Sequence, residues 1–330
     1  MILDSNFVEK MNLYGRNGIK FLFIIDFEMK FPIIMKLSEA KDFCVKYFID
    51  GANNYTEYAD NISDTNELKI QKNPVPFKVY KKAFNNVIKH EKAGNSYLVN
   101  LTFKSPVKIN LGLQEIFYKS RSKYKLYFKN SSGEFVLFSP ETFINITGGN
   151  IFTYPVKGTI SAGIPNAKEI ILNDKKERAE HLTVVDLLRN DLNIVCKEVK
   201  VNRFYFMETV KTNFGELLQM TSEIEGKIKP DLNTRFGDIL CSMLPAGSVC
   251  GAPKRKTLEI IKETEQEDRG YYTGVFGIYD GEIFKSSVMI RFIEKIGGKC
   301  FYRSGGGITV YSDIKKEYDE MTEKIYVPIY

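Results

Sequence analysis

The chain has 330 residues, 43% of them hydrophobic, and its 47 basic against 41 acidic residues give a net charge of +6. This composition supports one or two folded domains and excludes a disordered or low-complexity protein. The charge is modest and dispersed, and its size alone fits an anionic small-molecule substrate or weak nucleic-acid contact equally well. Its dispersal argues against a nucleic-acid-binding module, because such a module needs clustered basic and aromatic residues on one face.

Five widely spaced cysteines without a CxxC pair predict neither a disulfide framework nor a zinc site. The sequence holds two histidines, which argues against a histidine-based triad or metal centre. The opening MILDSNFVEKMN lacks a signal-peptide pattern, and the apolar run at 21–27 is too short to span a membrane. We therefore expect a protein of the reducing cytoplasm, without a membrane partner.

In chain order, periodicity first predicts a buried strand at 21–26, a helix at 37–48 and a polar loop at 51–67. Helical periodicity at 78–92 precedes a strand at 97–103. Short strands then dominate up to residue 160. This N-terminal half mixes helices with strands that are close in sequence, which is typical of an α+β protein.

Two of these short strands, at 142–147 and 151–156, flank Gly148-Gly149-Asn150, a signal for a three-residue hairpin loop. In that register Glu141 faces Lys157, with their Cβ atoms about 5 Å apart. The pair is then either a cross-strand ion pair worth about 0.2–1 kcal/mol or an acid and an amine placed for chemistry.

The surroundings of Lys157 favour a well-positioned side chain. Pro155 fixes one backbone torsion before it, and Gly158 permits a bend directly after it. A lysine at such a strand end is held more firmly than an ordinary surface lysine. Lys157 is therefore a candidate for a chemical role.

The remaining segments continue the mixture of helices and antiparallel hairpins. They are a helix at 166–190, strands near 217–228, a helix at 231–243, a Gly-rich loop at 247–253, a helix at 254–263, a hairpin of strands 273–279 and 283–293, a strand at 299–303, SGGG at 304–307 and a helix at 313–325. With no repeat and no clear linker, this pattern predicts an α+β fold of two interlocked layers of mostly antiparallel sheet flanked by helices.

Two predicted helices carry carboxylates that could bind a metal. Glu180 lies in the helix at 175–191, and Glu317 and Glu320 lie three residues apart in the last helix. A solvated helix face is the ordinary interpretation, and Glu320–Lys324 has the spacing of an exposed ion pair worth about 0.3–0.5 kcal/mol. Carboxylates from two helices would suit Mg²⁺, which takes oxygen ligands and retains waters.

Glycine-rich segments and one arginine are candidates for anion binding. The segments at 158–163 and 247–254 lack the GK[ST] ending of a nucleotide P-loop and could be ordinary turns. The amides of 304–307, directly before a helix, could bind a substrate carboxylate. Arg291 near a strand end could clamp a carboxylate through two hydrogen bonds.

Taken together, seven motifs occur in a fixed order: SPETF (139–143), PVKGT (155–159), ERAEHLTVVDLLRNDL (177–192), IEGKI (224–228), AGSVCGAPK (246–254), IR (290–291) and SGGGITVYSDIKKEYDE (304–320). With these motifs the chain resembles the chorismate-utilising enzymes, most closely component I of aminodeoxychorismate synthase, from about residue 97 to 324. The resemblance implies that family's fold. It places the catalytic region at 81–330 and a weakly matched N-terminal part at 1–80, interleaved in one domain.

The resemblance also implies catalytic roles. Lys157 matches the lysine that attacks C2 of chorismate while the C4 hydroxyl leaves, where anthranilate synthases carry alanine. Glu141 matches the general acid that assists this departure. Nucleophilic attack requires a neutral amine beside a protonated Glu141, and hence a water-poor site. Leu98 stands where isochorismate and salicylate synthases have a general-base lysine, which argues against the water-adding branch.

By the same resemblance the cofactor is Mg²⁺, with Glu180 and Glu320 as ligands and Glu317 as a partner through water. The residues that match the family's substrate-binding groups are Arg291, Tyr272, Gly307, Lys324 and Ser248. Two positions depart from the family pattern, namely Gln219 in place of a frequent histidine and Cys250 in place of a hydroxyl residue.

The implied reaction converts chorismate and ammonia to 4-amino-4-deoxychorismate, on the route to p-aminobenzoate and folate. Ammonia is expected from a separate glutamine amidotransferase subunit, because no glutaminase Cys-His-Glu region is visible in this chain. The alternative within the same scaffold is component I of anthranilate synthase, which aminates C2 and eliminates pyruvate.

Overall fold

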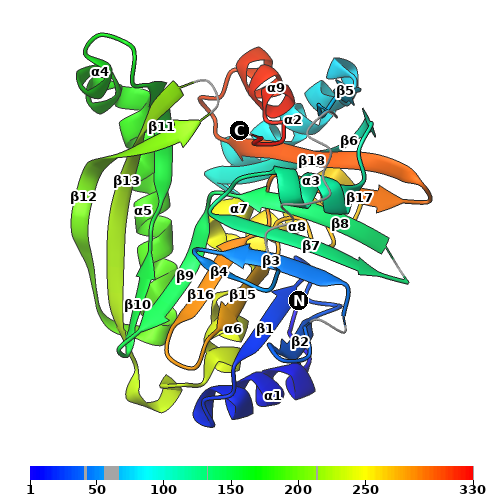
Figure 1. The fold of residues 1–330 in the computed structure, drawn as a ribbon. Coiled ribbons are helices and arrows are strands. Elements are labelled where there is room, and N and C mark those ends of the chain that lie inside the picture. Colours follow the sequence, from blue (N-terminus) through cyan, green and yellow to red (C-terminus); the bar gives the residue numbers. More distant parts are fainter. Residues whose placement is uncertain (41–42, 56–66, 132, 213–214, 330) are drawn as a thin grey trace.

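The computed structural model describes residues 1–330 apart from 41–42, 56–66, 132, 213–214 and 330. Its described strands form two nine-stranded antiparallel sheets, which we call sheet A and sheet B, with helices packed around them (Figure 1). The predicted α+β fold of two mostly antiparallel layers flanked by helices is confirmed.

Sheet A has the strand order β11-β13-β10-β9-β16-β15-β1-β2, and β12 pairs with β13. Its strands are β1 (Phe21–Ile25), β2 (Ile33–Lys36), β9 (Thr142–Thr147), β10 (Asn150–Thr153), β11 (Val156–Ser161), β12 (Cys196–Thr212), β13 (Gly215–Ile228), β15 (Val275–Tyr279) and β16 (Phe284–Val288).

Sheet B has the order β14-β6-β18-β17-β8-β7-β3-β4, and β5 pairs with β6. Its strands are β3 (Val45–Ile49), β4 (Ala52–Asn53), β5 (Ile70–Lys72), β6 (Leu98–Ile109), β7 (Tyr124–Asn130), β8 (Gly133–Ser139), β14 (Gly251–Ala252), β17 (Phe292–Ile296) and β18 (Lys299–Ile308).

The helices cover the outer faces of both sheets (Figure 1). They are α1 (Ser5–Arg16), α2 (Phe77–Lys92), α3 (Leu113–Lys119), α4 (Ala167–Asn173), α5 (Lys175–Val195), the 3₁₀ turn η1 (Pro230–Leu232), α6 (Phe236–Met243), α7 (Gly247–Cys250), α8 (Lys254–Glu265) and α9 (Ile314–Glu323). Among the described residues, no helix is both long and apolar enough to cross a membrane.

Strand β1 shows how the layers pack, because all five of its residues are buried. Side chains alternate along a strand. Phe21, Phe23 and Ile25 enter a core that includes residues of α1, α5 and α6, whereas Leu22 and Ile24 enter a second core with β3, β7 and β8. Sheet A therefore lies between a helical layer and sheet B. Helices α2, α8 and α9 pack on β6 in a third core on the other side of sheet B.

The chain passes between the two sheets at two neighbouring points. Pro140-Glu141 joins β8 to β9, and the segment 289–291 joins β16 to β17. The crossings are hydrogen-bonded, since the Phe138 amide donates to the Arg291 carbonyl at 3.2 Å and the Val288 amide donates to the Glu141 carbonyl at 3.3 Å. Glu141 and Arg291 are thereby fixed together at the seam between the sheets.

Most predicted elements are present, but the helix predicted at 37–48 is wrong. The chain turns after β2 and then forms β3, which pairs with β7. Val45, Tyr47 and Ile49 are buried while the residues between them are half-buried, and this period of two with β-branched and aromatic residues is typical of a strand. Most of the predicted loop at 51–67 falls on 56–66, outside the described residues.

Three other predictions change in detail. The helix expected at 166–190 is two helices, α4 and α5, and the Asp174 side chain accepts the Glu177 amide at the start of α5. The strands expected near 217–228 are the single strand β13. The strand expected at 283–293 is divided between β16 of sheet A and β17 of sheet B.

Candidate active site

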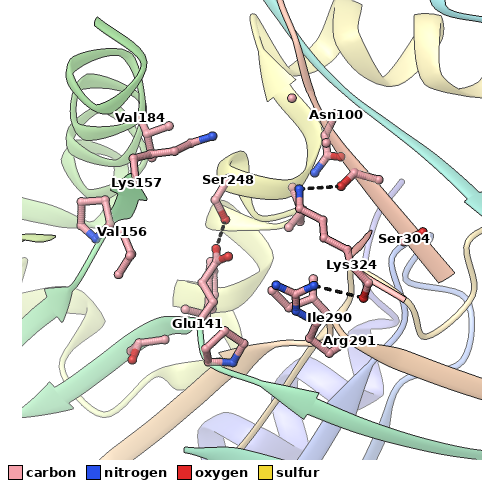
Figure 2. A pocket seen from close by; sticks show the side chains of 18 of the residues that line it. Asn100, Glu141, Val156, Lys157, Val184, Ser248, Ile290, Arg291, Ser304 and Lys324 are labelled. Atoms are coloured by element: carbon pink, nitrogen blue, oxygen red, sulfur yellow. Dashed lines mark hydrogen bonds between the residues drawn. The ribbon is translucent and has the colours of Figure 1, made fainter. Parts of the chain in front are cut away.

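A cavity of about 340 Å³ lies at the seam between the sheets (Figure 2). Its walls come from the Pro140-Glu141 crossing, β11, α7, β18 and α9. Eight of the predicted site residues line it, namely Glu141, Lys157, Ser248, Tyr272, Arg291, Gly307, Glu320 and Lys324. The fold thus collects residues from distant parts of the sequence into one polar pocket.

Lys157 reaches the cavity from β11. The ladder between β11 and β13 shifts register between Lys157 and Thr159, and Gly158 adopts a left-handed φ of +74° at this bulge. Glycine permits this backbone conformation, and bulges of this kind re-aim side chains. The Lys157 amine lies 3.7 Å from a carboxylate oxygen of Glu180 on α5, with the two side chains 34% and 29% exposed. Such a partly solvated pair contributes little to stability and can be exchanged for other partners.

Glu141 is the partly buried acid of the cavity. The Ser248 hydroxyl donates a 2.6 Å hydrogen bond to its Oε1 atom (Figure 2). Burial raises the pKa of the Glu141 carboxyl, and this hydrogen bond and the charges of Lys157 and Lys324 offset the rise in part. The carboxyl therefore holds its proton to higher pH than an ordinary glutamic acid, as a general acid requires.

The predicted pairing of Glu141 with Lys157 across a hairpin is wrong. β9 and β10 do form a hairpin, but its turn is the two-residue Gly148-Gly149, with φ of +56° and +78°. Positive φ at both positions is the requirement of a type I′ turn. The chain then leaves β9, and β11 pairs with β13 so that Lys157 lies opposite Met220. The two residues share the cavity without being strand partners.

A partly buried ion pair lies beside the segment that carries Ser248. The Lys254 amine donates to Asp191 Oδ1 at 2.9 Å and to the Met243 carbonyl at 2.7 Å, which ties the start of α8 to α5 and α6. A side chain at Gly247 would place its Cβ 2.8 Å from Asp191 Oδ2, so glycine is needed for this close approach. The GSVCGAPK segment therefore contributes to the cavity by presenting the Ser248 hydroxyl.

Two cationic side chains form the wall opposite Lys157. Arg291 has a left-handed φ of +54°, its guanidinium donates to the Lys324 carbonyl at 3.1 Å, and it lies 4.7 Å from the centre of the Tyr326 ring. The Lys324 amine donates to the Gly305 carbonyl at 3.0 Å and pairs with Glu320 at 2.7 Å. Figure 2 shows both cations at the side of the cavity away from Lys157. This wall suits a carboxylate ligand.

Tyr272 and the glycine segment complete this wall. Burial raises the pKa of Tyr272 to about 12, so its hydroxyl keeps the proton and can donate to an anion. The segment 304–307 belongs to β18 and pairs with β6, and α9 begins seven residues later at Ile314, so its expected place directly before a helix is wrong. A Cβ at Gly305 would lie 2.3 Å from the Leu101 carbonyl oxygen, which explains glycine here by the close approach of two strands.

The three candidate metal ligands differ in their position relative to the cavity. Glu320 lines it, Glu180 lies beside Lys157, and Glu317 is buried and accepts a 2.9 Å hydrogen bond from the Ser312 hydroxyl. Within the described part of the chain, no group of three or more His, Cys, Asp or Glu side chains is arranged to hold a metal. The oxygen donors of Glu180 and Glu320 nevertheless suit Mg²⁺, which keeps several waters and substrate oxygens.

Two residues of this site were not predicted from the sequence. Asn100 of β6 lines the cavity, and the two-residue period that places it on the same strand face as Leu98 was a usable signal. Arg269 is 1% exposed, pairs with Glu265 at 2.6 Å and donates to the carbonyls of Asn100 and Val249. No motif in its local sequence indicates that Arg269 binds the backbone of two segments that line the cavity.

The two departures from the family pattern lie at different depths. Gln219 lines the cavity and pairs across the ladder with Thr159 of β11. Cys250 is fully buried, and burial raises the pKa of its thiol to about 11, so it stays protonated at neutral pH. Gln219 is therefore the departure in a position to contact a ligand.

Comparison with known proteins places the chain in a family. It is 44% identical over 325 residues to an uncharacterized PabA-like protein of Haemophilus influenzae, covering 98% of this chain and 97% of that protein. It is 31% identical over 260 residues to aminodeoxychorismate synthase component 1 of Bacillus subtilis, covering 75% of this chain and 54% of the relative.

The menaquinone-specific isochorismate synthase MenF of Escherichia coli has the same fold, with a TM-score of 0.72 at 14% identity over 97% of this chain and 80% of that structure. The sequence model described as chorismate binding enzyme matches residues 36–329. The chain therefore belongs to the chorismate-binding enzyme family.

Proposed function

We propose that this protein converts chorismate and ammonia to 4-amino-4-deoxychorismate. The observation that carries the proposal is the presence in one cavity of an amine, Lys157, and a partly buried acid, Glu141, whose pKa is raised. The named activity of the Bacillus subtilis relative supports the same reaction. Isochorismate formation is disfavoured because Leu98 offers no general base on β6.

Chorismate is a dianion, and the cavity supplies matching donors. Arg291 and Lys324 would bind one carboxylate, with the protonated Tyr272 hydroxyl as a neutral donor beside them. Their mutual contacts hold them in place before the substrate arrives, so little ordering is required on binding. Mg²⁺ held by Glu180 and Glu320 would neutralise the other carboxylate.

The chemistry then needs one nucleophile and one acid. The neutral Lys157 amine forms a bond to C2 of chorismate, and both conjugated ring double bonds shift toward C4. The C4–O bond breaks as Glu141 gives its proton to the departing oxygen, which leaves as water. The Lys157 amine pairs with Glu180 in this structure, so it must leave that carboxylate before it can attack C2.

Ammonia completes the reaction in a second displacement. It attacks C4, both ring double bonds shift back, and the C2–N bond to Lys157 breaks, while the Glu141 carboxylate takes a proton from the incoming nitrogen. The enzyme returns to its starting state, and chorismate plus ammonia become the amino product plus water. We propose that a separate glutamine amidotransferase subunit supplies the ammonia.

Product analysis tests the reaction. The protein is incubated with chorismate, an ammonium salt and Mg²⁺, and the products are identified by mass spectrometry. The expected product retains the enolpyruvyl group and carries nitrogen at C4. Anthranilate with an equal amount of pyruvate would instead establish the alternative reaction at C2 and refute the proposal.

A metal titration tests the two carboxylates. Glu180→Gln and Glu320→Gln should each raise the Mg²⁺ concentration needed for half-maximal activity by about tenfold, because each removes one charged oxygen ligand. Glu323→Gln on the same helix as Glu320 is the control and should leave the titration unchanged. Identical titration curves for all four proteins would exclude Glu180 and Glu320 as ligands.

A further inference from the structure

Two fully buried polar side chains lie next to the elements that carry Lys157 and Glu180. His181, the residue after Glu180 on α5, and Ser222 on β13 both have 0% exposure. Their Nε2 and Oγ atoms are 2.7 Å apart and form a hydrogen bond. This bond joins α5 to sheet A within a buried layer, where losing a partner is costly.

Ser222 also holds the strand that carries Lys157. Its backbone amide donates to the Pro155 carbonyl at 3.1 Å, two residues before Lys157, and the neighbouring ladder pair is Val156 with Thr221. One serine therefore binds β11 through its backbone and α5 through its side chain. One end of this connection is His181, next to Glu180, and the other is Pro155, two residues before Lys157.

Tyr205 of β12, at the edge of sheet A, contacts both His181 and Ser222. The ladder between β12 and β13 is irregular near Tyr205, which has a left-handed φ of +53°. The Tyr205 amide donates to Ser222 Oγ at 3.2 Å, its ring centre lies 4.9 Å from that of His181, and its hydroxyl donates to the Arg178 carbonyl of α5 at 2.6 Å. Figure 1 shows α5 lying along these curved strands.

We propose that His181 and Ser222 are positioning residues that set the separation between the Lys157 amine and the Glu180 carboxylate. The inference rests on the proposed function where catalysis is concerned, but the placement of Lys157 can be measured without turnover. Glu180 lies on α5 and Lys157 on β11, so the distance between the two side chains depends on how firmly the helix is bonded to the sheet. The hydrogen bond from His181 to Ser222 is the buried side-chain link next to this pair.

The geometry also predicts which kinetic constant changes. Arg291, Tyr272 and Lys324 lie on other elements and do not contact His181 or Ser222, so loss of the tie leaves substrate anchoring in place. Lys157 would be misplaced relative to a normally bound substrate. Misplacement of a reacting group lowers kcat, whereas KM stays close to its original value.

The first experiment measures Lys157 directly. Ser222→Ala and His181→Gln are treated with pyridoxal 5′-phosphate and borohydride, and labelling of Lys157 is quantified by peptide mass spectrometry against the exposed Lys168. We expect labelling of Lys157 to rise about two- to fivefold relative to Lys168, because the ion pair with Glu180 is loosened. Thermal melts verify that each variant is folded.

Two further variants make the result specific. Ser286→Ala removes another fully buried serine of sheet A, whose hydroxyl bonds the Ile144 backbone, and should leave Lys157 labelling unchanged. Ser222→Thr keeps the hydroxyl and should restore the original labelling rate. Unchanged labelling in folded Ser222→Ala and His181→Gln, or an equal rise in Ser286→Ala, would overturn the inference.

The second experiment uses steady-state kinetics with chorismate and an ammonium salt. We expect kcat of Ser222→Ala to fall about tenfold or more with KM for chorismate changed less than about twofold. If labelling rises while kcat is unchanged, the positioning role stands and the covalent role of Lys157 fails. If the parent protein turns over no chorismate, the proposed function fails and the labelling result alone decides the inference.

Discussion

The two walls of the cavity are built differently. We call the wall that carries Arg291 and Lys324 the anchoring wall. Both side chains are fixed by hydrogen bonds to backbone carbonyls, and Arg291 adopts a backbone conformation that costs energy to maintain. We call the side of the cavity that carries Lys157 and Glu141 the reacting wall. Lys157 forms a partly solvated ion pair with Glu180, and the Glu141 carboxyl accepts a short hydrogen bond from Ser248.

This difference separates binding from chemistry. Groups that only hold a charge gain from being fixed before the ligand arrives, because little freedom is then lost on binding. Groups that accept or release protons must change partners during the reaction, and weak pairs permit this. Substitutions on the anchoring wall should therefore change KM, and substitutions on the reacting wall should change kcat.

The largest effect is expected at Lys157. Lys157→Ala should lower kcat by more than about 10³-fold, since no other amine of the reacting wall can form the bond to C2. Lys157→Arg keeps the positive charge but cannot act as a nucleophile at neutral pH, so it should be equally inactive. Substantial activity of Lys157→Arg in steady-state assays would reduce Lys157 to a charge and remove the distinction between the walls.

Glu141 should show the next largest effect, together with a characteristic pH dependence. Glu141→Gln should lower kcat about 10²–10⁴-fold through loss of the proton donor. As a general acid it works while protonated, so activity is present below its raised pKa and is lost as pH rises through that value. The Ser248 hydrogen bond lowers this pKa, so Ser248→Ala should extend activity to higher pH. A shift of the kcat profile to lower pH in Ser248→Ala would contradict this assignment.

Arg291 tests the anchoring wall. Arg291→Lys keeps a cation but loses the planar, two-pronged donor geometry, and we expect KM for chorismate to rise about 10–100-fold. kcat should change by less than about threefold, because Lys157 and Glu141 keep their positions. Steady-state kinetics at several chorismate concentrations separate the two constants. A fall in kcat without a change in KM would show that this wall takes part in the chemical step.

The anchoring wall could be predicted only in part from the sequence. Arg291 stands in a recognisable motif and Lys324 follows the last motif by four residues. Their mutual contact arises where the chain passes from β16 of sheet A to β17 of sheet B, and the strand predicted at 283–293 gave no sign of this crossing. Arg269 lies outside every motif, and its buried contacts depend on three separate segments. Contacts of this kind are set by tertiary packing, which local periodicity does not encode.

The reacting wall was predicted by residue but not by geometry. The motifs supplied Lys157 and Glu141, while the hairpin rule gave the wrong route between them, because a two-residue turn replaced the expected three-residue loop. The same rule correctly predicted a β15–β16 hairpin through Asp280-Gly281, although its loop spans 280–283 because Tyr279 pairs with Phe284. A shift of one residue in a hairpin alters every cross-strand pair. A correctly predicted hairpin between β9 and β10 therefore does not determine which residue lies opposite Lys157 on β11.

The smallest effect on catalysis is expected at Glu91 of α2, which packs behind the anchoring wall. It is 5% exposed, its two carboxyl oxygens have no hydrogen-bond partner, and burial raises its pKa to about 8. In the unfolded chain the group loses its proton near its ordinary value of 4.5. The folded state therefore binds more protons between these two values, and Glu91 makes the protein less stable as pH rises from about 4.5 to 8.

Glu91→Gln removes the charge while keeping the size of the side chain, so it should raise the free energy of unfolding at pH 8 by about 1–3 kcal/mol and change it little at pH 4.5. Denaturant unfolding at the two pH values measures this difference, and the exposed Glu9→Gln on α1 is the control. kcat and KM should both stay at their original values, which separates the stability of the anchoring side from its function. An equal gain at both pH values would mean that the substitution acts through packing and not through the buried charge.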